Sequence, residues 1–207
     1  MSNETKTVTR RTVAKGAAWS VPVVALGAGA AQAAASGEPT CPNCFKAGSI
    51  PTPVVSAATN TNGTAALFPW VATLNIDSTG CPLNLFRPAY TAIATNSTLT
   101  MTDGRSYTSN VGLGSGAGTF GQISAFAFAG NFSGVTLSRF PVVGTYPSNG
   151  IRPAKFCVDF NFILVGLPSL IQITCPQTLC WNVSSIPVGA GVGGVGVVTF
   201  TSTLSPA

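Results

Sequence analysis

Hydrophobic and polar residues alternate with a period of two along most of the chain beyond residue 55. In Trp70–Asp77 the even-numbered positions are apolar and the odd-numbered ones largely polar, which is the pattern of a strand with one buried face. Phe156–Leu164 repeats the pattern with a larger apolar face, and Asp159 and Asn161 stand on its polar face. Gly, Pro, Asn and Asp interrupt the alternation roughly every ten residues, which predicts many short strands joined by turns.

The sequence around Asp103-Gly104 predicts a hairpin. Leu99–Thr102 and Arg105–Thr108 flank this dipeptide, which tolerates the positive φ values of a two-residue type I′ turn. Further strands are expected at 64–68, 89–95, 121–129, 134–143, 156–165, 169–175, 181–186 and 195–203.

No stretch of ten residues outside the N-terminal region has apolar residues at helical spacing. The sequence therefore predicts an all-β fold, a single antiparallel β-sandwich over residues 56–207. Immunoglobulin-like domains share this architecture. The Cys…Trp…Cys spacing of true immunoglobulin domains is not evident, so the pattern predicts the architecture without the family.

Residues 1–35 have the composition of a cleavable signal peptide. A basic stretch, Thr9–Lys15, precedes an apolar stretch from Ala17 to Ala31 and then small residues, so cleavage is expected to leave a first residue between Ala34 and Ser36. The apolar stretch is shorter than the roughly 20 residues that a membrane-spanning helix needs, and no permanent anchor is expected. Residues 36–55 form a Pro-rich segment in which helix is disfavoured.

The paired arginines Arg10 and Arg11, with Val13 and Lys15 after them, resemble a twin-arginine export signal. The run over residues 10–25 is similar to leaders of exported proteins from high-GC Gram-positive (actinobacterial) bacteria. This resemblance implies that the export machinery is a partner and that the protein is destined for the cell envelope or the extracellular space. It covers only the leader and implies no activity. The alternative is an ordinary secretory leader with a chance arginine pair.

Charge is sparse once the leader is set aside. The whole chain carries +5, and the first 35 residues hold four bases and one acid, so the mature part keeps +2. Its six basic residues are scattered singly, which argues against nucleic-acid binding because that requires clustered Lys and Arg. Weak charge repulsion instead favours self-association or adhesion to an envelope polymer.

All six cysteines lie in the mature part, which predicts three disulfides in an exported domain. The expected pairs are Cys175–Cys180, Cys81–Cys157 and Cys41–Cys44. The Cys-x-x-Cys spacing of Cys41 and Cys44 leaves two alternatives open, a zinc site completed by Cys175 and Cys180 and a redox motif.

The chain contains no histidine, so it cannot build a Ser-His-Asp or Cys-His catalytic group. Paired carboxylates remain as a route to glycoside hydrolysis, with Asp159 as the first candidate acid. Gly191–Gly196 matches the spacing of a dinucleotide-binding loop, yet it leads into a predicted strand, so we expect a flexible loop and no cofactor.

The sequence thus predicts an exported, non-enzymatic β domain that acts as a structural, adhesive or binding module. The alternative function is a small secreted polysaccharide hydrolase that uses paired carboxylates.

Overall fold

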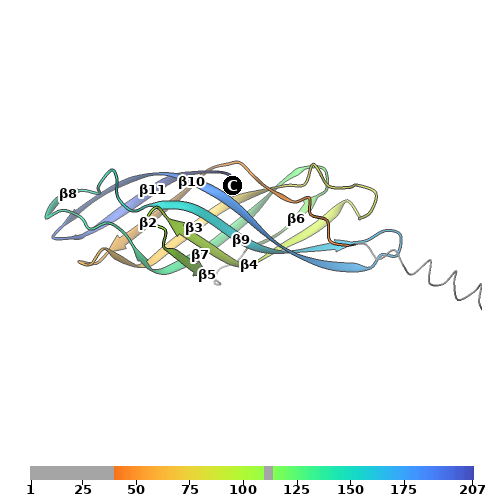
Figure 1. Cartoon of the computed structure of the whole chain (residues 1–207), viewed down its shortest axis with the longest axis horizontal. Coiled ribbons are helices and arrows are strands. Elements are labelled where there is room, and N and C mark those ends of the chain that lie inside the picture. The colour runs from red at the N-terminus through yellow and green to blue at the C-terminus, as the bar shows by residue number, and fades with distance from the viewer. Residues whose placement is uncertain (1–39, 110–113) are drawn as a thin grey trace, which may run out of the picture. The chain divides into compact units, whose positions relative to one another are not determined.

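The computed structural model describes residues 40–109 and 114–207, and within these ranges the chain forms eleven strands and no helix (Figure 1). The strands are β1 Lys46–Gly48, β2 Ile50–Thr59, β3 Thr64–Asp77, β4 Ala89–Met101, β5 Ser106–Ser109, β6 Ser115–Thr119, β7 Ile123–Thr136, β8 Val143–Thr145, β9 Pro153–Val165, β10 Gln172–Val192 and β11 Val195–Pro206. The predicted all-β fold is confirmed. The predicted leader, with Arg10, Arg11 and Lys15, lies outside the described residues.

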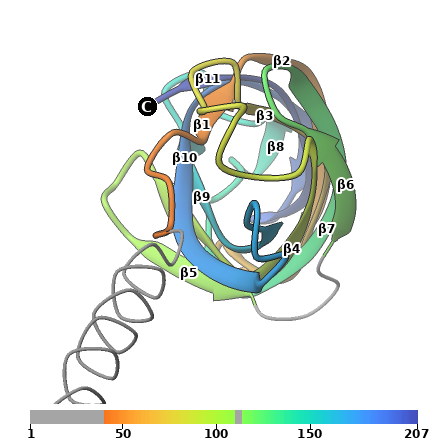
Figure 2. The same ribbon diagram turned by 90° about the vertical axis from the view of Figure 1, so that its right-hand side faces the viewer.

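All strands belong to one antiparallel sheet that curls around a common core (Figure 2). The order is β1-β3-β2-β11-β10-β9-β4-β5, with β7 paired to β3, β6 to β4 and β8 to β10. The two margins of the sheet meet where β5 approaches β7. There the Asn131 amide donates to Ser109 Oγ at 3.0 Å, and the Thr136 amide donates to the Tyr107 hydroxyl at 2.9 Å. Opposite parts of the sheet therefore face each other across the core, consistent with a β-sandwich.

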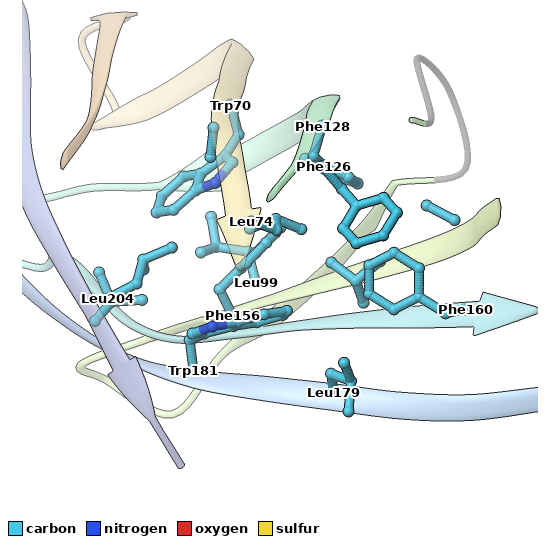
Figure 3. Packing of buried hydrophobic residues seen from close by; sticks show 14 of the residues in the cluster. Trp70, Leu74, Leu99, Phe126, Phe128, Phe156, Phe160, Leu179, Trp181 and Leu204 are labelled. Carbon is cyan, nitrogen blue, oxygen red and sulfur yellow. The ribbon is translucent and has the colours of Figure 1, made fainter. Parts of the chain in front are cut away.

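Alternate residues of the strands point inward and form one aromatic-rich core (Figure 3). Trp70 of β3 stacks on Phe156 of β9 with ring centroids 5.0 Å apart, and Phe45 stacks on Phe162 at 3.9 Å. Burying each such side chain stabilises the fold by about 1.5–3 kcal/mol. The core therefore ties the segment before β1 to the central strands.

Several strands are longer than the sequence predicted, and β10 is the clearest case. Its 21 residues join two predicted strands across Pro176 and include Pro187 as well. Pro187 lies after the stretch of β10 that pairs with β9 and before the stretch that pairs with β8. Pro176 lies in the part of β10 that does not pair with β11. Neither proline therefore interrupts a ladder that needs its missing N–H. Strand β1 and the first part of β2 form within the Pro-rich segment 36–55, for which no strand was predicted.

The turns of the β4–β5 and β10–β11 hairpins differ from the sequence prediction. Met101 and Arg105 close the β4–β5 hairpin around three residues, and only Gly104, with φ of 85°, is left-handed. The two-residue turn is instead Gly193-Gly194, whose φ values of 63° and 82° fit type I′. The run over residues 191–196, expected to be a flexible loop, is thus the tip of the β10–β11 hairpin.

All six cysteines form disulfides, as predicted, but with different partners. The pairs are Cys41–Cys175, Cys44–Cys81 and Cys157–Cys180. The expected pair Cys175–Cys180 is wrong because these residues lie five positions apart on one strand, roughly 16 Å, and face opposite sides of it. Cys157 and Cys180 are direct cross-strand neighbours with Cα atoms 4.1 Å apart. Because Cys41 and Cys44 are oxidised with distant partners, the zinc and Cys-x-x-Cys redox alternatives also fail.

Candidate functional site

An open groove of about 460 Å³ lies between β1 and β10, beside the end of β11. We call it the β1–β10 groove. Its walls are Phe45, Lys46, Ala47, Asp77, Gln177, Thr178, Leu179, Cys180, Pro206 and Ala207.

Side chains, not a backbone ladder, connect the two strands that flank this groove. Gln177 Nε2 donates to the carbonyl of Phe45 at 2.8 Å, and the buried indole of Trp181 donates to the carbonyl of Gly48 at 2.9 Å. The segment before β1 is held by the disulfides of Cys41 and Cys44. These covalent and hydrogen-bonded links fix β1 beside β10 while leaving a gap between the two strands.

The edge of β10 that faces the groove is open. Pairing with β11 begins at Trp181–Pro206, and from Gln172 to Cys180 β10 pairs only with β9 among the residues that the structure describes. The short Cα separation of Cys157 and Cys180 marks a non-hydrogen-bonded pair, so the peptide groups of Cys180 point away from β9. Its carbonyl indeed accepts from the Ala207 amide at 3.2 Å. By the same alternation, the peptide groups of Thr178 point into the groove.

Two oppositely charged residues stand at one wall of the groove. Lys46 of β1 and Asp77 of β3 are partners in the antiparallel register. Hydrogen bonds from the Thr79 hydroxyl at 2.6 Å and the Thr79 amide at 2.9 Å hold the pKa of Asp77 below its ordinary value, and Lys46 lowers it further. Asp77 is therefore a carboxylate at neutral pH.

Asp159, the first candidate acid from the sequence, borders the groove through one contact. Its carboxylate accepts from the Thr178 hydroxyl at 2.6 Å and from Asn96 Nδ2 at 3.3 Å. Thr178 itself lines the groove, so Asp159 supports the wall of the groove from the neighbouring strand. Sequence reasoning found Asp159 but missed Thr178 and Lys46, because only the pairing of β1 with β3 and of β9 with β10 brings these residues together.

The remaining described acid, Asp103, lies in the β4–β5 turn at 3.5 Å from Arg105. The described part of the chain holds no cluster of three or more Cys, Asp or Glu side chains suited to a metal ion. A carboxylate hydrolase needs one acid whose pKa is raised, so that it can donate a proton. At Asp77 the pKa is lowered instead, which suits charge recognition better than proton donation.

A second surface feature lies at the other end of β10. On the outer side of β8, β10 and β11, large aliphatic side chains are 44–75 % exposed in neighbouring positions. In the register, Val143, Val192 and Val195 form one row and Ala190 and Val197 the next. We call this surface the aliphatic face; its large members are Val143, Ile186, Val188, Val192, Val195 and Val197.

The residues on the inner side of the β10–β11 hairpin explain why the sequence pattern did not predict the aliphatic face. Gly189, Gly191 and Gly196 face inward, and the ring of Phe140 lies against Gly191 and Gly196. In most strands the larger apolar residue faces the core, whereas in this hairpin glycine faces the core and valine faces outward. Valine alternating with glycine has no polar face, so the pattern over residues 191–196 predicts a flexible loop and not a strand.

No known protein family matches the chain, and neither a curated protein nor a solved structure resembles it. Residues 40–109 and 114–207 contain no helix of the length and hydropathy that crossing a membrane requires.

Proposed function

We propose that the chain is an exported β domain that acts by contact, as a structural, adhesive or binding module at the cell envelope or outside the cell. The leader pattern over residues 9–36 supports export. Three disulfides point to an oxidising compartment, which is the usual setting for such bonds. The low charge of the mature part favours close contact with another surface.

The aliphatic face carries the proposal. Three neighbouring strands over about six residues cover roughly 300 Å². That is in the range of the largest apolar patch on a typical soluble monomer, which is often functional. The face holds no aromatic side chain to stack on a sugar ring, whereas a second aliphatic surface can cover it and remove it from water. A second copy of the chain supplies such a surface, and we assign the contact to self-association.

Charged substitutions in the aliphatic face test this function. Val188→Lys with Val197→Lys places two ammonium groups at positions 66 % and 54 % exposed, so folding is spared while apolar contact is opposed. We expect self-association, measured by sedimentation of the purified chain, to weaken at least tenfold. The matched control is Leu67→Lys with Val71→Lys on β3, at 61 % and 64 % exposure outside the face, which should leave association unchanged. If both double variants associate equally, the aliphatic face is not the surface of self-association.

The hydrolase alternative keeps one supporting observation, since Asp77 lines the groove and Asp159 borders it through Thr178. Incubation of the purified chain with cell-wall polysaccharide tests it. Sustained release of sugar that Asp159→Asn abolishes would replace the contact function with catalysis. Unchanged polysaccharide supports the contact function.

A further inference from the structure

We infer that copies of this chain associate head to tail, with the aliphatic face of one copy packed on a second apolar surface of the next copy. The inference rests on the self-association proposed above and names the surface that covers the aliphatic face. This second surface consists of exposed aliphatic side chains on two loops. We call it the leucine loops; its members are Leu83, Leu85, Leu167, Leu170 and Ile171.

Backbone hydrogen bonds join the β3–β4 and β9–β10 connections into one surface. The Leu167 amide donates to the Leu85 carbonyl at 2.9 Å, and Phe86 and Gly166 form an isolated bridge beside this bond. The Leu170 amide donates to the Gly166 carbonyl at 2.9 Å and closes the turn of the second loop. Phe86 is buried in the core, whereas the five aliphatic side chains are 37–64 % exposed. The loops therefore hold aliphatic groups in water on a backbone that is fixed by hydrogen bonds.

The leucine loops and the aliphatic face lie at opposite ends of β10 (Figure 1). The leucine loops end at Ile171, directly before the first residue of β10, and the aliphatic face begins at Ile186 on the same strand. Residues 172 and 186 are roughly 45 Å apart along an extended strand. The two apolar surfaces are therefore separate, and contact with a single copy through either one leaves the other in water.

Area argues against a dimer in which two aliphatic faces pack on each other. Such a dimer buries roughly 600 Å² in total, because each face covers roughly 300 Å². Stable specific interfaces bury about 1,200–2,000 Å². A head-to-tail contact is no larger, but it repeats, so each interior copy of an assembly has both apolar surfaces covered. The apolar area removed from water per copy is then about doubled.

Charge argues against contact between two sets of leucine loops. Arg87 is exposed beside them, and its amide donates to the Val165 carbonyl at 2.8 Å. A contact between identical surfaces brings the Arg87 side chains of both copies to one interface, where like charges repel. The aliphatic face has no charged member. A head-to-tail contact therefore sets a single Arg87 against an uncharged surface.

The leucine loops lack the side chains that bind a lipid surface. Segments that lie at a membrane surface are rich in Lys and Arg and carry exposed Trp or Phe. Residues 82–88 and 166–171 contain one basic residue, Arg87, and one aromatic residue, Phe86, which is buried. Their exposed groups match the aliphatic face of a second copy better than a bilayer.

Mixing two variants, each blocked at one end, tests the inference. One is the double variant Val188→Lys with Val197→Lys in the aliphatic face, and the other is Leu83→Lys with Leu170→Lys, at 64 % and 52 % exposure in the leucine loops. In analytical ultracentrifugation we expect the mean mass of the unaltered chain to keep rising with concentration beyond that of a dimer. Each variant alone should associate at least tenfold more weakly, and an equimolar mixture should form a one-to-one dimer that grows no further.

The dimer in the mixture shows that both variants are folded, since each supplies the end that the other lacks. Its dissociation constant should lie within about threefold of that of a single contact in the unaltered chain. The variant pair Leu85→Gln with Ile171→Gln should behave as Leu83→Lys with Leu170→Lys does, without adding charge. The matched control on β3, Leu67→Lys with Val71→Lys, should associate as the unaltered chain does.

The outcomes separate this inference from the proposed function. If the variant blocked at the leucine loops still dimerises alone, the aliphatic face pairs with itself; the head-to-tail arrangement is then wrong and self-association stands. If the variant blocked at the aliphatic face associates like the unaltered chain, both are wrong. A mixture that stays monomeric overturns the inference. So does binding to vesicles of phosphatidylglycerol and phosphatidylcholine that the leucine-loop substitutions abolish while self-association persists, because the loops then bind lipid.

Discussion

Phe140 illustrates how single residues fix the end of the core beneath the aliphatic face. Its ring is buried, lies edge-on to Tyr146 at 5.4 Å between centroids, and occupies the space that glycine leaves at positions 191 and 196. Tyr146 in turn donates its hydroxyl to the Ile151 carbonyl at 2.6 Å and accepts from the Ser138 amide. The glycines of the hairpin are therefore packing residues, and replacing them should lower the free energy of unfolding.

Gly191→Ala tests this packing role. A Cβ at position 191 would lie 2.5 Å from Phe140 Cγ and would also overlap the Val195 carbonyl oxygen, so the hairpin or the ring must shift. We expect the free energy of unfolding, measured by urea titration, to fall by about 1–3 kcal/mol. Gly80→Ala is the matched control, because no atom lies within 4 Å of its added Cβ. Equal stability of the two variants would contradict the packing role.

At the scale of elements, the sequence predicted strand type better than strand extent or pairing. Alternation located β3, β9 and β11 because each has one apolar and one polar face. It missed β1 and β2, since proline and small residues conceal alternation and these strands are defined by partners far along the chain. The disulfide pairs were missed for the same reason. Cys157 and Cys180 become neighbours only through the register of β9 with β10, which no local pattern reveals.

The three disulfides should contribute unequally to stability. Cys41–Cys175 spans 134 positions and Cys157–Cys180 spans 23, so removing the longer link frees more conformational entropy in the unfolded chain. Chain entropy alone gives losses of about 5 and about 3.4 kcal/mol. We expect the double variant Cys41→Ala with Cys175→Ala to be less stable in urea than Cys157→Ala with Cys180→Ala. The reverse order would contradict this assignment, as would non-reducing peptide mapping that shows other pairs.

At the scale of the whole molecule, the candidate site arises where three distant segments meet. The groove combines the segment before β2, the end of β3 and the middle of β10, and the chain end at β11 closes it. The sequence indicated one nearby acid, Asp159, because it interrupts an apolar strand. It did not reveal that β1, the end of β3 and the middle of β10 lie side by side, because these segments are paired with partners far along the chain.

The scarcity of titratable groups predicts how stability depends on pH. The chain has no histidine and its cysteines are all disulfide-bonded, so the groups that ordinarily titrate near neutrality are missing. Asp77 has a lowered pKa, so its stabilising contribution is present above the unfolded pKa and is lost as pH falls through the folded one. Burial raises the pKa of Tyr90 and of Tyr146. Above about pH 10 the unfolded chain therefore loses protons that the folded chain retains, and stability falls as pH rises.

Calorimetry across pH checks this expectation. The melting temperature should stay level from about pH 5 to about pH 9 and decline at higher pH. Tyr146→Phe removes one of the two tyrosines with a raised pKa. It should lower the melting temperature throughout, because the bonds to Ser138 and Ile151 are lost, yet make the alkaline decline shallower. Arg139→Gln, at an exposed position, serves as the control and should leave the shape of the curve unchanged. A step in stability between about pH 5 and pH 8 would contradict the prediction, because none of the titrations assigned to the folded domain falls there.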